Sequence, residues 1–285
     1  MSVLNNRPSI NSVKAKAISF TCTVALLLFF SVVNTVNVHA TVPVPSGFTA
    51  ISSGTGVTVY RKNYTGGQPD FVTVVDLRYA TLQSYTGWAQ SDGTVERRSL
   101  TTHWQNAVAQ NTSTRIAKVA INGTFFDPNM SPYTGIAFGL KANWWIMSRG
   151  YAAGTEYPGL IRTLTYDATY NSSSIQAYNS TTFDQGISDV VGGLDPTANK
   201  DRYSNIPRTF VGVRDDNGDG HCETVIFFSS KYATQAWATN ILTGFGTVAR
   251  MMLDGGGSTG LVVDGTQHIP TSRTLPHVFI VSAGK

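Results

Sequence analysis

Hydrophobic and polar residues alternate, or hydrophobic residues form short runs, along most of the chain after residue 40. The runs at 57–60 (VTVY) and 71–77 (FVTVVDL) have the length and the Val, Thr and aromatic content of β-strands. The segment between them, 66–70 (GGQPD), is typical of a turn. Apolar runs at 210–214 and 224–228 flank a polar segment and predict a hairpin. The pattern therefore predicts many short strands joined by tight turns.

Two segments, about 100–108 and 233–245, instead repeat their apolar residues at the spacing of a helix. Each precedes an apolar strand, at 116–121 and 248–253, that ends in a polar loop containing glycine. Two such loops at strand ends suggest two parts of one site meeting at a sheet edge. We expect a single α+β domain, with a mixed, largely antiparallel β-sheet system and a few packed helices.

The first 40 residues have the composition of a secretory signal peptide. Three basic residues precede an apolar stretch at 17–33, and 38–40 (VHA) is a small-residue cleavage site. A retained membrane anchor is the competing interpretation, but the strongest apolar core, 24–30, is short beside the roughly 20 residues of a spanning helix. We therefore expect a signal peptide at 1–40 and a mature domain at 41–285. That domain would be secreted or extracytoplasmic, without a stable membrane anchor.

Removal of the leader leaves a chain with almost balanced charge. Of the 21 lysines and arginines three lie in residues 1–40, which leaves 18 against 17 aspartates and glutamates. No basic cluster with interleaved aromatic residues remains, so nucleic acid is not an expected partner. Cys22 leaves with the leader, and Cys222 then has no partner for an intrachain disulfide. We interpret Cys222 as a buried strand residue rather than as a nucleophile or ligand.

The most informative stretch is 253–258 (LDGGGS), where an apolar strand leads into a carboxylate and three glycines. Glycine costs roughly 0.5–1 kcal/mol relative to alanine in a regular element. Three in a row indicate that the backbone turns sharply or approaches something closely. Bare amides on such a turn can donate to an anionic oxygen. The Asp254 carboxylate would lie beside that anion site.

Three motifs resemble, in their order, those of the phosphodiester glycosidase family. They are 122–127 (NGTFFD), 207–209 (PRT) with 211–213 (VGV) after it, and 253–258 (LDGGGS). The family's best-known member removes N-acetylglucosamine from a sugar–phosphate–sugar diester. The resemblance extends from about Val72 to the C-terminus. It implies a hydrolase that cleaves a glycosyl-1-phosphodiester bond in a glycan or cell-envelope polymer, with a carbohydrate phosphodiester as substrate.

Some of these motif residues are suited to holding the phosphate. The planar guanidinium of Arg208 matches two phosphate oxygens. The amides of Gly255, Gly256 and Gly257 could bind the same anion, with the Ser258 hydroxyl beside them. We predict that these five residues form the phosphate-binding part of the site.

Other candidates face the sugar. A carboxylate beside the anomeric carbon can act as nucleophile, base or electrostatic support, and Asp254 is the first candidate, with Asp127 second. Asn122, with Gly123 next to it, would hydrogen-bond the substrate, and His277 would line the same pocket. Because phosphate is a fairly good leaving group, a second paired carboxylate is not required.

Each candidate also has a purely structural interpretation. Asp254 could cap a turn, Arg208 could pair with a surface carboxylate, Asn122 with Gly123 is an ordinary turn dipeptide, and Asp127 could end a strand. A non-catalytic glycan- or phosphate-binding module of the same fold is therefore an alternative function.

A serine hydrolase is a second, weaker alternative. Residues 256–260 match the G-x-S-x-G elbow with Ser258 as nucleophile. That elbow leads into a helix, whereas 261–263 (LVV) predicts a strand. Only 27 residues follow Ser258 to place the two partners.

No cofactor is required by this chemistry, but one loop suggests a structural metal. Asp215, Asn217 and Asp219 fit the start of a calcium loop. Its final acidic ligand is missing, because Ile226 stands at the expected position and Glu223 comes too early. A hairpin tip without metal is the simpler interpretation. Two adjacent aromatic residues, Trp144 and Trp145, could stack on a sugar or pack in a core.

Overall fold

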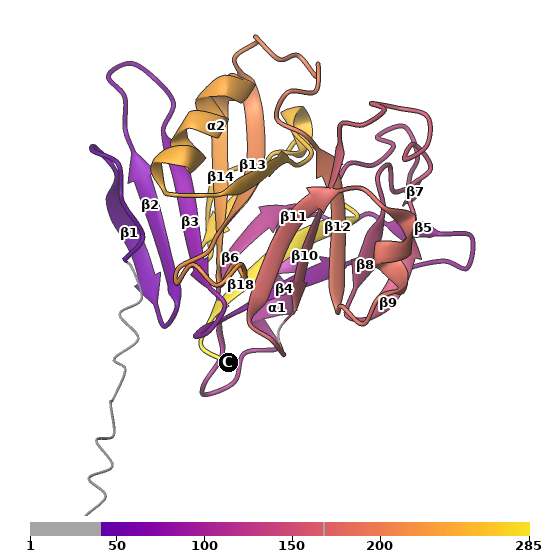
Figure 1. The fold of residues 1–285 in the computed structure, drawn as a ribbon, viewed down its shortest axis with the longest axis horizontal. Coiled ribbons are helices and arrows are strands. Elements are labelled where there is room, and N and C mark those ends of the chain that lie inside the picture. The colour runs from indigo at the N-terminus through magenta and orange to yellow at the C-terminus, as the bar shows by residue number, and fades with distance from the viewer. Residues whose placement is uncertain (1–40, 168) are drawn as a thin grey trace, which may run out of the picture. The chain divides into compact units, whose positions relative to one another are not determined.

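The structure is a computed structural model that describes residues 41–167 and 169–285. The predicted signal peptide lies outside the described residues, all of which belong to one unit, Val38–Lys285. Strands dominate, as the alternation predicted, and the described chain has two α-helices, α1 (Leu100–Val108) and α2 (Gln235–Gly244) (Figure 1). No described helix is long and apolar enough to cross a membrane. The fold is largely β, so the expected α+β class overstates the helical part.

Eleven strands form the larger sheet. Its main path, in spatial order, consists of β1 (Thr49–Gly54), β2 (Val57–Lys62), β3 (Asp70–Asp76), β14 (Thr224–Ala233), β13 (Ile206–Arg214), β15 (Ala249–Met252), β12 (Asp189–Leu194), β10 (Ile161–Asp167) and β11 (Ser172–Ala177). A hairpin of β8 (Leu140–Ala142) and β9 (Trp145–Ser148) pairs with β12.

A second sheet has five strands, in the order β17 (Thr266–Ile269), β16 (Leu261–Val263), β6 (Ile116–Asn122), β18 (His277–Ala283) and β4 (Ala80–Thr86). A small ribbon pairs β5 (Thr94–Glu96) with β7 (Tyr133–Gly135). Every strand pair in the described residues is antiparallel. The sheets are thus antiparallel throughout, and the expected mixed character is wrong.

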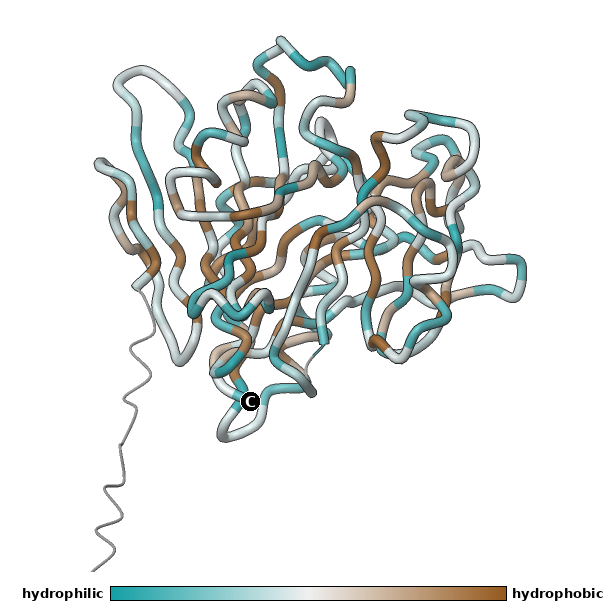
Figure 2. The backbone as a smooth tube through the Cα atoms, viewed as in Figure 1, coloured by the Kyte–Doolittle hydropathy of each residue, from teal (hydrophilic) through white to brown (hydrophobic). Residues whose placement is uncertain are grey.

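The centre of the larger sheet is buried on both faces. Along β14, Val225 and Phe227 belong to one apolar cluster, and Ile226 and Phe228 belong to another. The first cluster also contains Phe279 of the second sheet, whose ring lies 4.9 Å from that of Phe227 between centroids. Burial of both faces explains why these strands are continuous apolar runs in the sequence. The apolar colouring in Figure 2 follows these central strands, whereas the loops are mostly polar.

Helix α2 covers the second cluster through Ala238, Ile241 and Leu242, and Thr234 caps its N-terminus by accepting the Trp237 N–H at 3.1 Å. The second sheet covers the other face. This topology brings the three motif segments together. Asn122 at the end of β6, the first residues of β13 and the end of β15 come together where the two sheets meet.

Candidate active site

Asn122 is the point at which the three sequence motifs join. Its side-chain oxygen accepts hydrogen bonds from the Thr209 hydroxyl at 2.5 Å and from the Gly260 amide at 3.1 Å. Its side-chain nitrogen donates to the Asp254 carbonyl at 2.7 Å. Asn122 is fully buried and does not line the cavity described below. The predicted contact with substrate is therefore replaced by a positioning role, because the amide is used within the protein.

Main-chain hydrogen bonds reinforce this junction. The Asp254 amide donates to the Gly123 carbonyl at 3.1 Å, and the Leu253 amide donates to the Thr209 carbonyl at 2.9 Å. Gly123 is required by a close approach, since a Cβ there would lie 1.9 Å from Nδ1 of His277. The loop that carries Asp254 is thus fixed by strands distant in sequence.

His277 lies behind the site rather than in it. Its Nδ1 accepts the Thr124 N–H at 3.2 Å, and the side chain is buried. Burial lowers the pKa of His277 to about 3, so the imidazole is neutral at physiological pH. Neither Gly123 nor His277 lines the Asp254 cavity, so the structure does not bring them to the other predicted site residues there, and their part in substrate binding stays a prediction.

The three glycines behave as their sequence predicted. Gly256 has a positive φ of 58°, which disfavours a side chain there. A Cβ on Gly257 would lie 2.5 Å from the Ser272 hydroxyl, and one on Gly255 would lie 3.0 Å from the Pro207 carbonyl. The loop therefore turns sharply and also approaches its neighbours closely.

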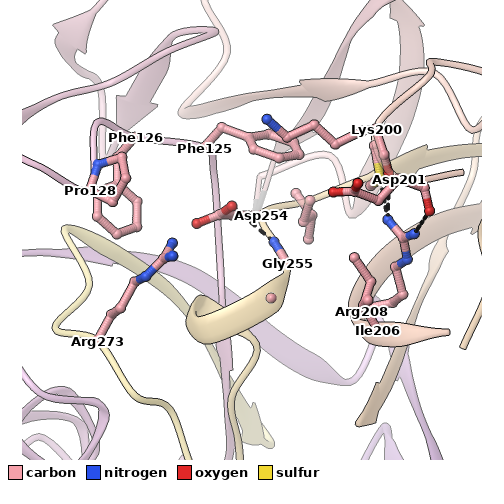
Figure 3. Close-up of a pocket in the computed structure, with 13 residues that line it drawn as sticks. Phe125, Phe126, Pro128, Lys200, Asp201, Ile206, Arg208, Asp254, Gly255 and Arg273 are labelled. Atoms are coloured by element: carbon pink, nitrogen blue, oxygen red, sulfur yellow. Dashed lines mark hydrogen bonds between the residues drawn. The ribbon is translucent and has the colours of Figure 1, made fainter. Parts of the chain in front are cut away.

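A cavity of about 290 Å³ opens above this loop (Figure 3). Of the predicted site residues, Asp254, Gly255, Gly256 and Arg208 line it, whereas Gly257 and Ser258 lie in the loop behind the lining. The remaining lining residues are Phe125, Phe126, Pro128, Lys200, Asp201, Ile206, Met252, Leu253 and Arg273. Its volume is close to the lower end of the range for small-ligand sites, about 300–1,000 Å³.

Asp254 is the carboxylate at the centre of the cavity wall. Its Oδ1 accepts the Gly255 N–H at 2.9 Å. Burial raises the pKa of Asp254 to about 6, against the opposing effects of the Ser258 hydroxyl beside it, of that amide and of the positive charges on Arg273 and Lys200. The carboxylate is therefore ionised at neutral pH, but it takes up a proton in mildly acidic solution. A shifted carboxylate in a cavity is typical of functional sites.

Arg208 lines the cavity but offers little to a ligand. Its Nε donates to the Ala233 carbonyl at 3.2 Å, and its two terminal nitrogens donate to the carbonyls of Lys200 at 2.9 Å and Asp201 at 2.5 Å, with a weaker bond to Ser204 at 3.3 Å. The side chain is buried. The hydrogen-bond donors of Arg208 are thus used within the protein, and they bind neither a surface carboxylate nor an open position for phosphate. Arg208 holds the 200–204 loop in place.

The cavity wall also carries two cations that lie outside the three sequence motifs. Arg273 and Lys200 line the cavity and are exposed. Within the described chain, neither side chain makes a hydrogen bond or an ion pair; the Lys200 ammonium lies 5.9 Å from the ring centroids of Phe125 and Tyr157. Figure 3 shows the Arg273 guanidinium and the Asp254 carboxylate directed into the same space. Asp201 adds a second carboxylate to the wall.

The signals for these residues in the sequence are weak. Arg273 follows the glycine loop by fewer than twenty positions, in a segment that ends at His277. Lys200 belongs to a polar loop with no motif of its own. Hydrogen bonds from Arg208, 8 residues along the chain, and from the Gln235 side chain to the Lys200 carbonyl hold that loop at the cavity.

Asp127 and Ser258 do not reach the cavity. The Asp127 carboxylate accepts the amide of Asn129 at 2.9 Å, and its carbonyl accepts the Thr134 hydroxyl at 2.6 Å, so Asp127 closes a turn. Ser258 is fully buried, and strand β16 follows its loop where a nucleophile elbow needs a helix. The geometry thus gives neither a second catalytic carboxylate at Asp127 nor a serine nucleophile.

A sequence model of the phosphodiester glycosidase family matches residues 115–282. The chain belongs to the phosphodiester glycosidase family. The match contains all three motifs that Asn122 joins, together with Lys200 and Arg273. No curated protein sequence matches the chain.

Three solved structures that are similar to the chain can be named. The catalytic domain of zebrafish N-acetylglucosamine-1-phosphodiester alpha-N-acetylglucosaminidase is 14% identical, with a TM-score of 0.51, over 83% of this chain and 87% of that one. A hypothetical protein from Synechocystis is 13% identical over 84% and 69% of the chains, with a TM-score of 0.48. A candidate exported protein of Burkholderia pseudomallei is 10% identical over 75% and 74%, with a TM-score of 0.47.

The acidic hairpin at 215–220 lies at the opposite end of β13 from Arg208. The Asp215 carboxylate accepts the amides of Asn217, Gly218 and Gly220 at 3.2, 2.6 and 2.8 Å. Asp219 and Glu223 each place a carboxylate oxygen within 4.8 Å of a carboxylate oxygen of Asp215. Glu223, which comes too early in the sequence for the last ligand of a calcium loop, is therefore close to Asp215 in space. These are ligand types that Ca²⁺ takes, but the loop's own amides already bind the Asp215 oxygens.

Two remaining expectations concern single side chains. Cys222 is buried, and burial raises the pKa of its thiol to about 11, which agrees with a structural residue. Trp144 and Trp145 lie at the tip of the β8–β9 hairpin and are 56% and 75% exposed, so they do not pack in the core. Neither of them lines the Asp254 cavity.

Proposed function

We propose that the protein is a secreted hydrolase that cleaves the glycosyl-1-phosphodiester bond of a glycan or cell-envelope polymer. The observation that carries the proposal is the arrangement around one cavity of the Asp254 carboxylate and two cations, Arg273 and Lys200, which make no hydrogen bond or ion pair within the described chain. Membership of the phosphodiester glycosidase family supports the same reaction class.

The phosphate has a natural place between the two cations. The planar fork of Arg273 can bind two phosphate oxygens, and the Lys200 ammonium adds a point charge. The Gly256 amide makes no hydrogen bond within the described chain, so it is a further donor on the same wall. In this proposal Arg208 and Asn122 act through the loops that they hold and do not touch the substrate.

Asp254 acts at the sugar. As the bond between the anomeric carbon and the phosphate oxygen breaks, its electron pair leaves with the phosphate and positive charge develops on the sugar. The Asp254 carboxylate stabilises that charge, and water completes the hydrolysis by adding to the anomeric carbon. The apolar faces of Phe125 and Phe126 can pack against the sugar ring. The reaction as proposed uses no metal or cofactor.

The decisive experiment is turnover by the mature protein, residues 41–285, with methyl N-acetylglucosamine-1-phosphodiester and related hexose-1-phosphodiesters. Released reducing sugar is quantified, and binding is measured in parallel by calorimetry. Sugar release that saturates with substrate supports the hydrolase. Saturable binding without release across all sugars would instead favour a glycan- or phosphate-binding module.

Secretion is tested separately. We expect the protein expressed with residues 1–40 to appear outside the cytoplasm with its N-terminus at residue 41. N-terminal sequencing of the recovered protein checks this, and an intact Met1 on membrane-bound material would contradict it.

A further inference from the structure

A second cavity, about 360 Å³ in volume, lies on the other side of the 200–206 loop from the Asp254 cavity. Three aromatic residues line it: Tyr64 from the β2–β3 loop, Tyr232 near the end of β14, and Trp237 in the first turn of α2. We call it the aromatic groove. Tyr232 and Trp237 are 59% and 42% exposed, so their rings are accessible to a ligand.

The aromatic groove is organised around a buried carboxylate. Asp70 is 1% exposed, and its Oδ2 accepts hydrogen bonds from the Tyr64 hydroxyl at 2.7 Å and the Trp237 indole N–H at 2.8 Å. The two rings meet edge to face with centroids 6.0 Å apart. The second Asp70 oxygen accepts no hydrogen bond within the described chain. The groove therefore combines rings held in fixed positions with a carboxylate oxygen that remains available.

Its electrostatics differ from those of the Asp254 cavity. No lysine or arginine of the described chain lines the aromatic groove, and its one charged lining residue is Asp70. The Asp254 cavity has three cations in its wall. A phosphate would be repelled by Asp70 and would meet no cation in the lining, where the nearby Lys62 ammonium lies 5.6 Å from the ring centroid of Tyr64; a neutral polar ligand with an apolar face would fit.

The two cavities share a wall. Asn205 lines the aromatic groove and the next residue, Ile206, lines the Asp254 cavity. Arg208 fixes this wall from inside, through the carbonyls of Lys200 and Asp201 on one side and of Ala233, next to the groove residue Thr234, on the other. A chain that passes over the 200–206 loop can therefore occupy both cavities.

We propose that the aromatic groove is a subsite for a neutral sugar residue of the same polymer whose phosphodiester enters the Asp254 cavity. The rings of Tyr232 and Trp237 pack against the C–H faces of the sugar, and the free oxygen of Asp70 accepts one of its hydroxyl groups. This inference rests on the proposed function for the identity of the polymer.

The test compares two substrates in the wild-type protein and in Tyr232→Ala. One substrate is methyl N-acetylglucosamine-1-phosphodiester, and the other joins the same phosphate to a neutral hexose tetrasaccharide. We expect Tyr232→Ala to lower kcat/KM for the long substrate by about three- to tenfold and to leave the short substrate unchanged. Tyr170→Ala, which removes a 76% exposed tyrosine elsewhere, is the matched control. Equal effects on both substrates, or none on either, would overturn the subsite.

A second measurement keeps the subsite testable if neither substrate is cleaved. The free neutral tetrasaccharide is titrated into Asp254→Asn while tryptophan fluorescence is recorded. Saturable quenching that Trp237→Phe and Tyr232→Ala weaken supports the subsite even when turnover is absent. No quenching at millimolar sugar, or quenching only by an apolar peptide, overturns it.

Discussion

Two loops of this molecule are built from the same residue types, an aspartate followed closely by glycines, yet they hold their carboxylates in opposite ways. In the 215–220 loop, Asp215 accepts three amides of its own turn, and these hydrogen bonds lower its pKa. In the 254–257 loop, Asp254 accepts one amide, and burial raises its pKa to about 6. The Asp215 carboxylate thus receives its hydrogen bonds from its own turn, whereas burial makes the ionised form of Asp254 less favourable.

The difference comes from where each loop is anchored. The 215–220 loop is a hairpin tip between neighbouring strands, so its amides are free to fold back on Asp215. The 254–257 loop is held by Asn122 and Thr209 from other strands, through bonds to its main chain. Its backbone donates one hydrogen bond to the Asp254 carboxylate, from Gly255, and the carboxylate lines the cavity. Asp254 is therefore the stronger functional candidate of the two, because its carboxylate accepts fewer hydrogen bonds from its own loop and its pKa is raised.

The largest effect expected from this comparison is on turnover. Asp254→Asn should lower kcat/KM for glycosyl-1-phosphodiesters by at least about 10²–10³-fold, because it removes the charge that stabilises the anomeric carbon while keeping shape and volume. Asp215→Asn should leave kcat/KM unchanged. Initial rates of sugar release, on variants checked for native circular dichroism, measure both. Full activity in Asp254→Asn would refute the assignment.

A smaller effect separates the two kinds of arginine in the cavity wall. Arg273→Ala should lower kcat/KM by about 10- to 100-fold with little change in Tm, because the guanidinium is exposed and bonded to nothing in the described chain. Arg208→Ala should lower Tm strongly, since four carbonyls lose the hydrogen bonds that it donates. Arg149→Ala, at an exposed arginine outside the cavity, is the control. If Arg208→Ala kept its Tm and lost only activity, Arg208 rather than Arg273 would bind the phosphate.

Sequence reasoning could locate this site because its motifs are local. The apolar run that ends at Asp254 and the three glycines that follow are visible in eight residues, and their backbone demands are met in the structure. The strands could be predicted for the same reason, from short alternating or apolar runs, but their antiparallel pairing throughout could not. Helix content was overestimated, because two good helical segments say nothing about how many strands surround them.

The roles within the site could not be predicted in the same way. Arg208 and Asn122 carry the right chemistry for a ligand, but whether their donors face a ligand or a carbonyl depends on tertiary packing, with acceptors as far as 25 and 132 residues away. Arg273 and Lys200 lie in loops without a motif, and tertiary packing alone brings them to Asp254. Glu223 is a further example, because the ligand spacing of a calcium loop does not predict that its carboxylate lies close to that of Asp215.

The pH dependence of turnover sharpens the comparison further. If the ionised Asp254 is the active form, kcat/KM should rise about tenfold per pH unit below pH 6 and level off above it, because the pKa of Asp254 is about 6. Asp215→Asn should give the same profile, since that group stays ionised throughout this range. A limb that falls above pH 6 would instead make Asp254 a proton donor. The assay is run in constant-ionic-strength buffers from pH 4.5 to 8.

The smallest effects concern stability, and here the two loops should change in opposite directions. Because folding raises the pKa of Asp254, the folded protein binds the extra proton between about pH 4 and 6, and this group makes the fold less stable as pH rises through that window. Asp254→Asn should therefore stabilise the protein at pH 7 by about 1–2 kcal/mol, after allowance for partial exposure, or roughly 2–5 °C in Tm.

The effect of Asp215 ionisation on stability has the opposite sign. Folding lowers its pKa, so its stabilisation is present at neutral pH and is lost as pH falls below about 4. Asp215→Asn should lower Tm slightly at pH 7 and have little effect at pH 3, as thermal melts followed by circular dichroism can show. If both variants moved Tm the same way at pH 7, the contrast between a satisfied and a strained carboxylate would be wrong. The identification of Asp254 as the functional carboxylate would then lose its physical basis. That identification rests on a difference in sign: the ionised Asp254 destabilises the fold, whereas the ionised Asp215 stabilises it.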